Sequence, residues 1–508
     1  MTPLTLSRPA ALVAGVLAVL VALGIVATVA ASDARTVAAG VVAAKPVVET
    51  TVACPGLRSR EGYTESSVAA ATPPMAGGAA EATTPAPTSR ATVRTLTKDP
   101  ADGTNLIVLR DPGERGLYAG RSGERDSVVG RGVGLLAPGF SVTQTERTVD
   151  GAGRGIAATS CLPTGAEFWF VGAASGVGQR AVLVLTNPEG ATAAVDVDVY
   201  GARGPVDAPA ARGVQVEPRS RTELRLDQLA PGQRVLALHV KVTSGRLSAA
   251  LTETDVDGLQ PRGTDWIPTA LEPATRVIVP GVPPVAKGRE SSARLDVVAP
   301  GDSDAVVRLS LATSDGVFAP VGSDVLEVPA GSVASFDLTD VLRGQAASLL
   351  LESDVPVTAG ARVLLKRPDY YGDLLFLSAA APLSAAAVVP ENETTNDLAT
   401  RLVLTAPEQA ARVEVTAFNR TDSDTTTVAI DAGTTRVVTV TPPPGLRRYG
   451  LVVTPLPGSG PVVGVRFIDE EGSRGPLVSA LPLRAARLTA VVREAGPELT
   501  AGMQGYQS

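Results

Sequence analysis

The sequence has very few of the residues from which nucleophilic active sites and metal centres are most often built. Its 508 residues include one histidine and two cysteines. A Ser–His or Cys–His active site needs a positioned histidine, and a structural zinc site needs four nitrogen or sulfur ligands. The one histidine, His239, alternates with the apolar residues of VLALHVKV, which predicts a solvated surface position. We therefore expect neither catalysis by histidine nor a bound metal or other cofactor.

An excess of positive charge is also missing, because the formal net charge is −7. A basic surface is what attracts a phosphate backbone, so we expect no nucleic-acid partner. Carboxylates are plentiful, and two of them could in principle serve a glycosidase. Nothing in a single sequence pairs two carboxylates in space, so a carboxylate-dependent hydrolase remains a remote alternative.

Aromatic residues are scarce, with eight Phe, seven Tyr and two Trp. Three of them are adjacent in CLPTGAEFWFVG. In a strand, Phe168 and Phe170 point to one side and Trp169 to the other, so we expect the two Phe rings in a core and Trp169 as a candidate ligand contact. Tyr370 and Tyr371, among the turn residues of LKRPDYYGDLLF, are further candidate contacts, because amphipathic rings can bind sugars. A plain loop tip is the simpler interpretation of the tyrosine pair.

The longest apolar run lies near the N-terminus. Residues 10–31 contain no charge, and 22 residues extend about 33 Å as a helix, enough for a hydrocarbon core of about 30 Å. Arg8 precedes this run, which favours a cytoplasmic N-terminus. We predict a cytoplasmic segment at 1–9 and a transmembrane anchor at 10–31. A signal peptide, cleaved at the small residues that end the run, is the alternative.

The two cysteines, Cys54 and Cys161, both follow the apolar run. An extracytoplasmic compartment permits them to form a disulfide. Such a bridge would close a loop of more than about 100 residues, for which chain entropy predicts a stabilisation of about 4–5 kcal/mol. Two unrelated buried thiols are the other interpretation.

From Cys161 onward the chain repeats itself. Each of three units has a hydrophobic strand, a proline-containing turn and an alternating strand, and the prolines are Pro188, Pro300 and Pro407. Strand–turn–strand patterns follow in the same order, with a period of roughly 110 residues. One antiparallel sandwich per unit fits this pattern. The predicted fold is all-β, with tandem immunoglobulin-like antiparallel β-sandwiches after one N-terminal transmembrane helix.

The predicted segments are a first β-sandwich at 46–268, a second at 276–384, a third at 386–490 and a tail at 491–508. The first sandwich carries an N-terminal extension and, at 66–92, an excursion of low complexity that is rich in Ala, Thr and Pro. The stretch 93–160 is the least legible part, with short strand-like runs such as 105–109 and 134–137 between turns rich in Gly and Asp.

Four short motifs, taken with the apolar run, carry a resemblance to a known family. They are Cys54-Pro-Gly56, Cys161, Trp169-Phe-Val-Gly172 and Leu185-Thr-Asn-Pro188. The chain resembles an actinobacterial family of uncharacterised, membrane-anchored secreted proteins, classed as a domain of unknown function. Genes of that family often lie near a large envelope glycosyltransferase, so the resemblance implies a role in building surface polysaccharide. It implies no catalytic residues.

These observations lead to one functional expectation and one alternative. We expect a non-enzymatic envelope protein, attached to the cell membrane by one helix, with most of the chain outside the cytoplasm. It would act as a scaffold or interaction stalk in surface-polysaccharide assembly, with the membrane, envelope polysaccharide or a glycosyltransferase as partner. An array of carbohydrate-binding modules, with Tyr370 and Tyr371 as contacts, is the alternative.

Overall fold

The structure is a computed structural model, and it describes residues 42–56, 64–74, 89–121 and 127–493. The chain divides into two compact units, Val47–Leu488 and a small unit formed by both chain ends. In the small unit, β1 (Val42–Pro46) pairs antiparallel with β35 (Thr489–Arg493). The predicted cytoplasmic segment and anchor, at 1–9 and 10–31, lie outside the described residues, as does most of the predicted tail. Of the helices within the described ranges, none has the length and apolar character needed to cross a membrane.

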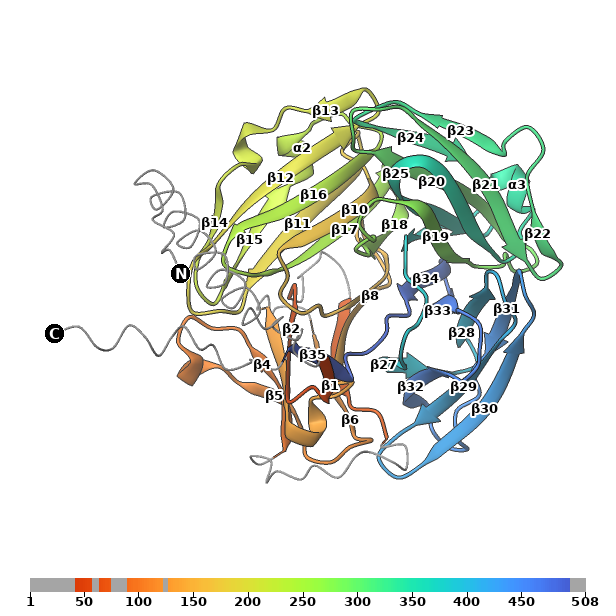
Figure 1. Cartoon of the computed structure of the whole chain (residues 1–508). Coiled ribbons are helices and arrows are strands. Elements are labelled where there is room, and N and C mark those ends of the chain that lie inside the picture. The colour runs from red at the N-terminus through yellow and green to blue at the C-terminus, as the bar shows by residue number, and fades with distance from the viewer. Residues whose placement is uncertain (1–41, 57–63, 75–88, 122–126, 494–508) are drawn as a thin grey trace, which may run out of the picture. The chain divides into compact units, whose positions relative to one another are not determined.

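Residues 47–488 contain four repeats of one strand pattern, which follow one another in the colour order of Figure 1. Repeat 1 is built from β2 (Glu49–Cys54), β3 (Thr64–Ala71), β4 (Arg90–Thr95), β5 (Asn105–Leu109), β6 (Arg115–Arg121), β7 (Val128–Val133), β8 (Ser141–Thr148) and β9 (Gly155–Ser160). Its two sheets have the orders β2-β7-β4-β5 and β6-β3-β8-β9. Two 3₁₀ turns, Pro100–Asp102 and Gly134–Leu136, complete it.

Repeat 2 contains β10 (Glu167–Ala173), β11 (Gln179–Asn187), β12 (Ala193–Gly201), β13 (Gly204–Val206), β14 (Val214–Val216), β15 (Ser220–Arg225), α2 (Leu226–Leu229), β16 (Leu236–Ser244), β17 (Ser248–Asp257) and β18 (Gln260–Ile267). Its sheets have the orders β10-β16-β12-β13, with β14 also beside β12, and β15-β11-β17-β18. A 3₁₀ turn lies at Pro209–Ala211.

Repeat 3 contains β19 (Ala274–Val282), β20 (Glu290–Ala299), β21 (Ala305–Thr313), β22 (Gly316–Phe318), β23 (Val325–Val328), β24 (Ser332–Asp337), α3 (Thr339–Leu342), β25 (Ala347–Lys366) and β26 (Gly372–Ser378). The long strand β25 pairs with β19 and β21 through its first half and with β20 and β26 through its second. Both halves of the repeat are therefore joined in one eight-stranded sheet.

Repeat 4 contains β27 (Ala387–Glu393), β28 (Leu398–Ala406), β29 (Ala411–Phe418), β30 (Ser423–Ile430), β31 (Thr434–Thr439), β32 (Arg448–Pro455), β33 (Val463–Gly472) and β34 (Gly475–Pro482). Its sheets have the orders β27-β32-β29-β30 and β31-β28-β33-β34. All four repeats share one arrangement: the first strand lies at the edge of one sheet, or half-sheet in repeat 3, and the last strand at the edge of the other.

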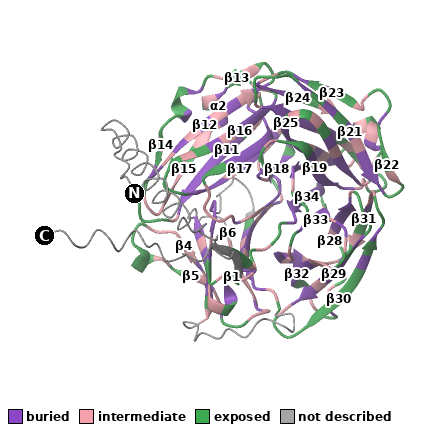
Figure 2. Cartoon of the chain, in the orientation of Figure 1, coloured by how far each residue is buried: buried purple, intermediate pink, exposed green. Residues whose placement is uncertain are grey.

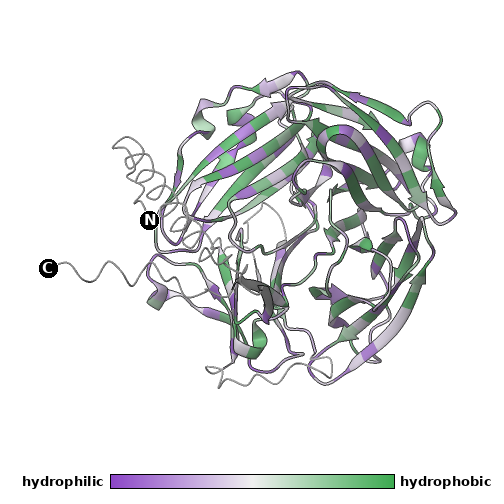
Figure 3. Cartoon of the chain, in the orientation of Figure 1, coloured by the Kyte–Doolittle hydropathy of each residue, from purple (hydrophilic) through white to green (hydrophobic). Residues whose placement is uncertain are grey.

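Each repeat has a hydrophobic core of its own, to which both of its sheets contribute. Strand β12 illustrates the cause, because Val195, Val197 and Val199 are buried while the two aspartates between them are not. Buried residues fill the facing sheets in Figure 2, and hydrophobic and hydrophilic residues alternate along the strands in Figure 3. Edge strands such as β30 stay largely exposed.

The predicted all-β class, with antiparallel sheets in a sandwich-like arrangement, is confirmed. The order of the strands differs from that of an immunoglobulin domain, whose first strand pairs with its second. In repeat 1 the first strand, β2, instead pairs with β7. The corresponding strand lies beside β16 in repeat 2, the first half of β25 in repeat 3 and β32 in repeat 4.

Two sequence expectations are corrected. The segment 46–268, predicted as one enlarged sandwich, holds two pairs of sheets with separate cores. The first six residues of the predicted excursion at 66–92 belong to β3, which pairs with a neighbouring strand on each side in its sheet. Both faces of β3 are covered, from Val68 to Ala71 without any exposed side chain, so small residues replace the alternating pattern that marks a half-buried strand.

The last strand of each repeat lies near the middle of this unit. Strand β18 lies against β9 and β26, and β34 lies against the same two strands. The repeats thus do not follow one another as a linear stalk, because repeat 4 also contacts repeat 1 through β27 and β8. We call β9, β18, β26 and β34 the central strands.

Candidate functional site

One buried carboxylate joins all four central strands. Asp373 follows Gly372 at the start of β26 and is fully buried. Its Oδ1 accepts the backbone N–H groups of Thr264 at 3.3 Å and Leu374 at 2.9 Å. Its Oδ2 accepts those of Ile156 at 3.1 Å and Val478 at 2.8 Å. The four donors come one from each central strand, so a single side chain fixes the repeats to one another.

A second buried carboxylate lies further along the same strands. Asp265 Oδ1 accepts the N–H groups of Trp266 at 2.8 Å and Ala158 at 3.1 Å, and the Ser479 hydroxyl donates to both carboxylate oxygens. Burial raises the pKa of Asp265 well above its usual value and that of Asp373 to about 7, and the N–H donors oppose this rise. Both carboxylates therefore accept hydrogen bonds from backbone N–H groups inside the protein.

Arg154 supports the same centre from the turn before β9. Its Nη1 donates to the carbonyl oxygens of Gly372 at 3.0 Å and Pro476 at 3.1 Å, and its Nη2 donates to that of Gly475 at 2.6 Å. The guanidinium thus bridges repeats 1, 3 and 4. Burial lowers the pKa of Arg154, and the Asp373 carboxylate opposes that effect.

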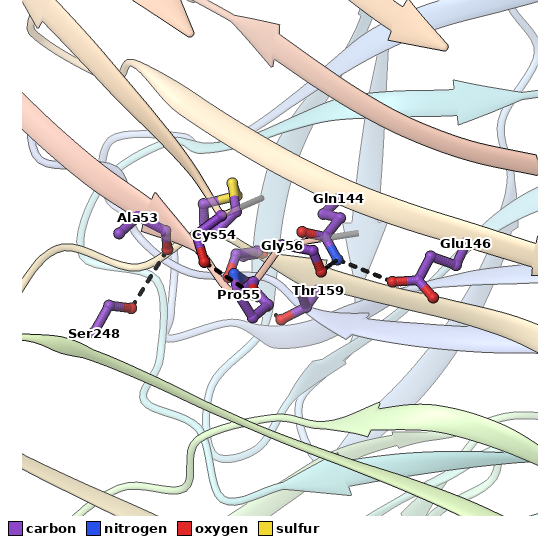
Figure 4. The surroundings of a disulfide bond; sticks show 11 residues. Ala53, Cys54, Pro55, Gly56, Gln144, Glu146, Thr159 and Ser248 are labelled. Carbon is purple, nitrogen blue, oxygen red and sulfur yellow. Dashed lines mark hydrogen bonds between the residues drawn. A yellow bond between two sulfur atoms is a disulfide. The ribbon is translucent and has the colours of Figure 1, made fainter. Parts of the chain in front are cut away.

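The predicted disulfide is present and closes repeat 1. Cys54 at the end of β2 is bonded to Cys161, directly after β9, across a sequence separation of 107 residues. Hydrogen bonds connect the residues around the disulfide to other strands, as Figure 4 shows. Gln144 Nε2 donates to the Gly56 carbonyl at 2.9 Å, and Ser248 from repeat 2 donates to the Ala53 carbonyl at 3.4 Å. The bridge therefore lies where repeat 1 meets repeat 2.

A cavity of about 880 Å³ lies at the C-terminal end of the central strands. Its wall includes parts of the segment that follows the last strand of each repeat: 161–165, 269–273, 379–382 and 483–487. Apolar side chains such as Phe140, Leu271 and Leu483 make up much of the wall, together with several threonines. A concave site with a mainly apolar wall and a minority of polar groups is the usual form of a small-molecule site.

Two arginines, Arg484 and Arg487, line this cavity. The Nη2 of Arg484 donates to the carbonyl oxygen of Thr269 at 2.7 Å and to the Thr269 hydroxyl at 2.6 Å. Arg484 is exposed and lines the cavity, so part of its side chain is open to solvent and to a ligand. No carboxylate within the described ranges forms an ion pair with it.

Trp169, on β10, also lines the cavity. The ring is only 4% exposed and stacks on His239, with ring centroids 3.9 Å apart. Glu167 Oε1 accepts from the indole Nε1 at 3.3 Å and lies 2.5 Å from His239 Nε2. Phe168 and Phe170 lie in the core of repeat 2, on the other side of the strand as the alternation predicts.

His239 differs from the solvated residue that the alternation predicts. It lies on the expected face of β16, opposite Leu238, but the Trp169 ring covers it and leaves it half-buried. Burial lowers the pKa of His239, and the adjacent Glu167 opposes that effect. A pattern of alternation gives the face of a strand, not the side chain that covers the face.

Tyr370 and Tyr371 lie in the turn between β25 and β26, away from the cavity. The Arg367 guanidinium stacks on Tyr370, 3.6 Å from its ring centroid, and the tyrosine is 47% exposed. The Arg154 guanidinium lies 5.9 Å from the Tyr371 centroid. The structure therefore does not bring Trp169 together with the tyrosine pair.

Sequence reasoning missed Asp265, Asp373 and Arg484. A recurrent glycine near the start of each last strand could have indicated the centre: Gly155, Gly263, Gly372 and Gly475. A Cβ on Gly155 or Gly263 would collide with the Asp373 carboxylate, so this close packing requires glycine.

Comparison with solved structures gives only distant likenesses. A glycoside hydrolase of family 32 from Bifidobacterium adolescentis is 9% identical over 88% of this chain and 98% of its own, with a TM-score of 0.13. An α-L-rhamnosidase from Streptomyces avermitilis, complexed with L-rhamnose, is 11% identical over 78% of this chain, which spans about half of that enzyme (54%), with a TM-score of 0.13. Scores this low carry no argument.

No curated protein matches the chain. A sequence profile of a protein family does match, over residues 119–441, from β6 through β31 and thus well over half of the chain. That family is described as a family of unknown function, DUF5719. The chain belongs to this family.

Proposed function

We propose that the protein is a non-enzymatic scaffold outside the cytoplasm, in which four β-sandwich repeats are locked together to present a binding cavity and an extended outer surface. The observation that carries the proposal is the Asp373 carboxylate, which accepts one backbone N–H from each repeat. Domains fixed in this way hold partners at constant separations, which serves an assembly role at the cell envelope. The cell membrane and a glycosyltransferase of surface polysaccharide are the partners we propose.

Two further observations support this proposal. The Cys54–Cys161 disulfide suits an oxidising compartment, in keeping with the predicted anchor or signal segment. Asp265 and Asp373, the closely placed carboxylates of the centre, are wholly buried and accept backbone N–H groups. They are poorly placed to act on an external glycosidic bond, so the pair favours a structural role over hydrolysis.

Carbohydrate binding through the tyrosine pair is the second candidate. The exposed ring of Tyr370 favours it, because such a ring can pack on the apolar face of a sugar. The Arg367 guanidinium already occupies one face of this ring. Only the remaining face could receive a ligand, which makes this candidate the weaker one.

Photo-crosslinking in the native envelope tests the proposal. A photoreactive amino acid replaces Leu259 or Val177, both fully exposed in turns of repeat 2, and Val321, fully exposed in repeat 3, serves as a second surface. The proposal predicts a defined protein partner, captured from one surface and not from the other. Capture of glycan alone, lost on replacing both Tyr370 and Tyr371 with alanine, would favour the second candidate. Release of sugar products from envelope polysaccharide by the purified protein would contradict a non-enzymatic role.

A further inference from the structure

The cavity at the end of the central strands has the size and the wall of a ligand site. Its volume, about 880 Å³, falls in the range of roughly 300–1,000 Å³ that is common for small-molecule pockets. All four repeats or the segments that follow them contribute to the wall. The repeats must be assembled before this cavity exists, which connects it to the architecture rather than to a single sandwich.

Arg484 gives the cavity its charge preference. The bonds of Arg484 to Thr269 use only Nη2, whereas a guanidinium has five N–H donors. The remaining donors belong to an exposed side chain that lines the cavity. This arrangement matches a planar anion such as a carboxylate, which a guanidinium binds through two parallel bonds.

The wall carries charges of both signs. Glu167 and Glu272 line the cavity together with a second arginine, Arg487. Carboxylates accept hydrogen bonds from hydroxyl groups. Glu167 is held in place by the Trp169 indole and by His239. The wall therefore favours a ligand that carries both carboxylate and hydroxyl groups.

We propose that the central cavity binds a hydroxylated carboxylate, an acidic sugar in the simplest case, with its carboxylate on Arg484 and its hydroxyls toward Glu167. This inference rests on the proposed binding role and names its ligand class. Thr269 fixes the guanidinium in position. The volume admits an oligosaccharide of a few residues.

A titration of the purified full-length protein tests the inference. Trigalacturonate is the acidic probe and galactotriose its neutral counterpart, followed by calorimetry and by tryptophan fluorescence, since Trp169 lines the cavity. The acidic probe is expected to bind at least about tenfold more tightly than the neutral one. Arg484→Gln is expected to remove this difference, and Arg484→Lys to retain part of it.

Arg436→Gln is the matched control, because Arg436 also donates to a carbonyl, that of Ala429 at 2.6 Å, but lies outside the cavity. Its affinity for trigalacturonate should equal that of the wild type. Thermal melts of both Gln variants show whether each is folded. If Arg484→Gln unfolds, protection of the wild-type wall segments by trigalacturonate in hydrogen exchange decides the question.

Three outcomes would overturn the inference: equal binding of both probes, binding of neither, or binding of trigalacturonate that Arg484→Gln leaves unchanged. Tighter binding of inorganic phosphate than of trigalacturonate would also overturn the inference, because the cavity would then select phosphate and not a carboxylate. These results are separable from the proposed scaffold role. Continued photo-crosslinking of the partner by Arg484→Gln would leave the scaffold standing while the ligand assignment fails.

Discussion

The Asp373 carboxylate accepts the backbone N–H of Val478 at 2.8 Å, although the two residues belong to different repeats. The same carboxylate is bonded to the other central strands, and Arg154 closes the arrangement from the turn before β9. Buried groups of this kind are costly to leave unpaired, so they fix one arrangement of the repeats. The cavity beside them depends on that arrangement.

Replacing Asp373 with asparagine should destabilise the whole unit. The amide retains one acceptor oxygen but turns an NH₂ group toward two of the four N–H donors, which are then unpaired. We expect a loss of about 2–4 kcal/mol in the free energy of unfolding, measured with urea at pH 8. The exposed Asp302→Asn should change it by no more than about 0.5 kcal/mol. Equal stabilities of the two variants would contradict the role given to Asp373.

Replacing Gly263 with alanine should be similarly harmful. Gly263 has a φ of +129°, and a Cβ there would collide with the Leu374 amide nitrogen and the Asp373 carboxylate. Both the strained backbone and the collision predict a cost of about 3 kcal/mol or more in thermal or urea unfolding. Gly258→Ala, in the same hairpin, meets no atom within 4 Å and should cost only about 1 kcal/mol. Equal unfolding midpoints for the two variants would contradict the close packing at Gly263.

The stability should fall as the pH rises from 5 to 8. Burial raises the pKa of both Asp373 and Glu253 to about 7. A carboxyl group with a raised folded-state pKa favours folding most below its unfolded pKa of about 4, and this contribution is lost as the pH rises through 7.

Glu253→Gln tests this pH dependence, since the amide can still accept the Ala174 N–H that bonds to Glu253 at 2.7 Å. The variant should show a shallower fall in unfolding free energy over this pH range, by about 1–3 kcal/mol. Glu217→Gln, exposed, should keep the slope of the wild type. Parallel slopes for all three proteins would show that Glu253 does not titrate in this range.

Removal of the disulfide should weaken repeat 1 and its contact with repeat 2. Replacing both Cys54 and Cys161 with alanine frees a loop of 107 residues, for which we expect a loss of about 2–5 kcal/mol in urea unfolding. The wild type with reducing agent should approach the same midpoint. An unchanged midpoint in both experiments would show that packing alone holds this junction.

Repeats 2 to 4 could be predicted because their turns are compact. Pro188, Pro300 and Pro407 each lie between the second and third main strands of a repeat. Repeat 1 has Pro73 after the corresponding strand, but a long insertion separates it from β4. The sequence of β7 also lacks an alternation of large apolar and polar residues, because Gly130 takes a buried position at which a Cβ would meet Val142 at 2.7 Å. Because this close packing requires glycine, the alternating pattern from which a strand is predicted is missing here.

The site was harder to predict than the fold. Asp373 and Val478 are far apart in sequence, and alternation gives the face of a strand without naming its partner. Trp169 was identified as a candidate contact because alternation turns it to the other side of the strand from Phe168 and Phe170, and it does line the cavity. Arg484 follows the last central strand in a segment without regular alternation, so only the assembled repeats bring it to Thr269.

Hydrogen exchange followed by mass spectrometry tests the central claim, that one carboxylate locks the four repeats together. The peptides of interest carry the amides of Ile156, Thr264, Leu374 and Val478. In the wild type these four amides should exchange slowly and with one common opening free energy. In Asp373→Asn all four should exchange faster together. Faster exchange at Leu374 alone, with the other three strands unchanged, would contradict the account.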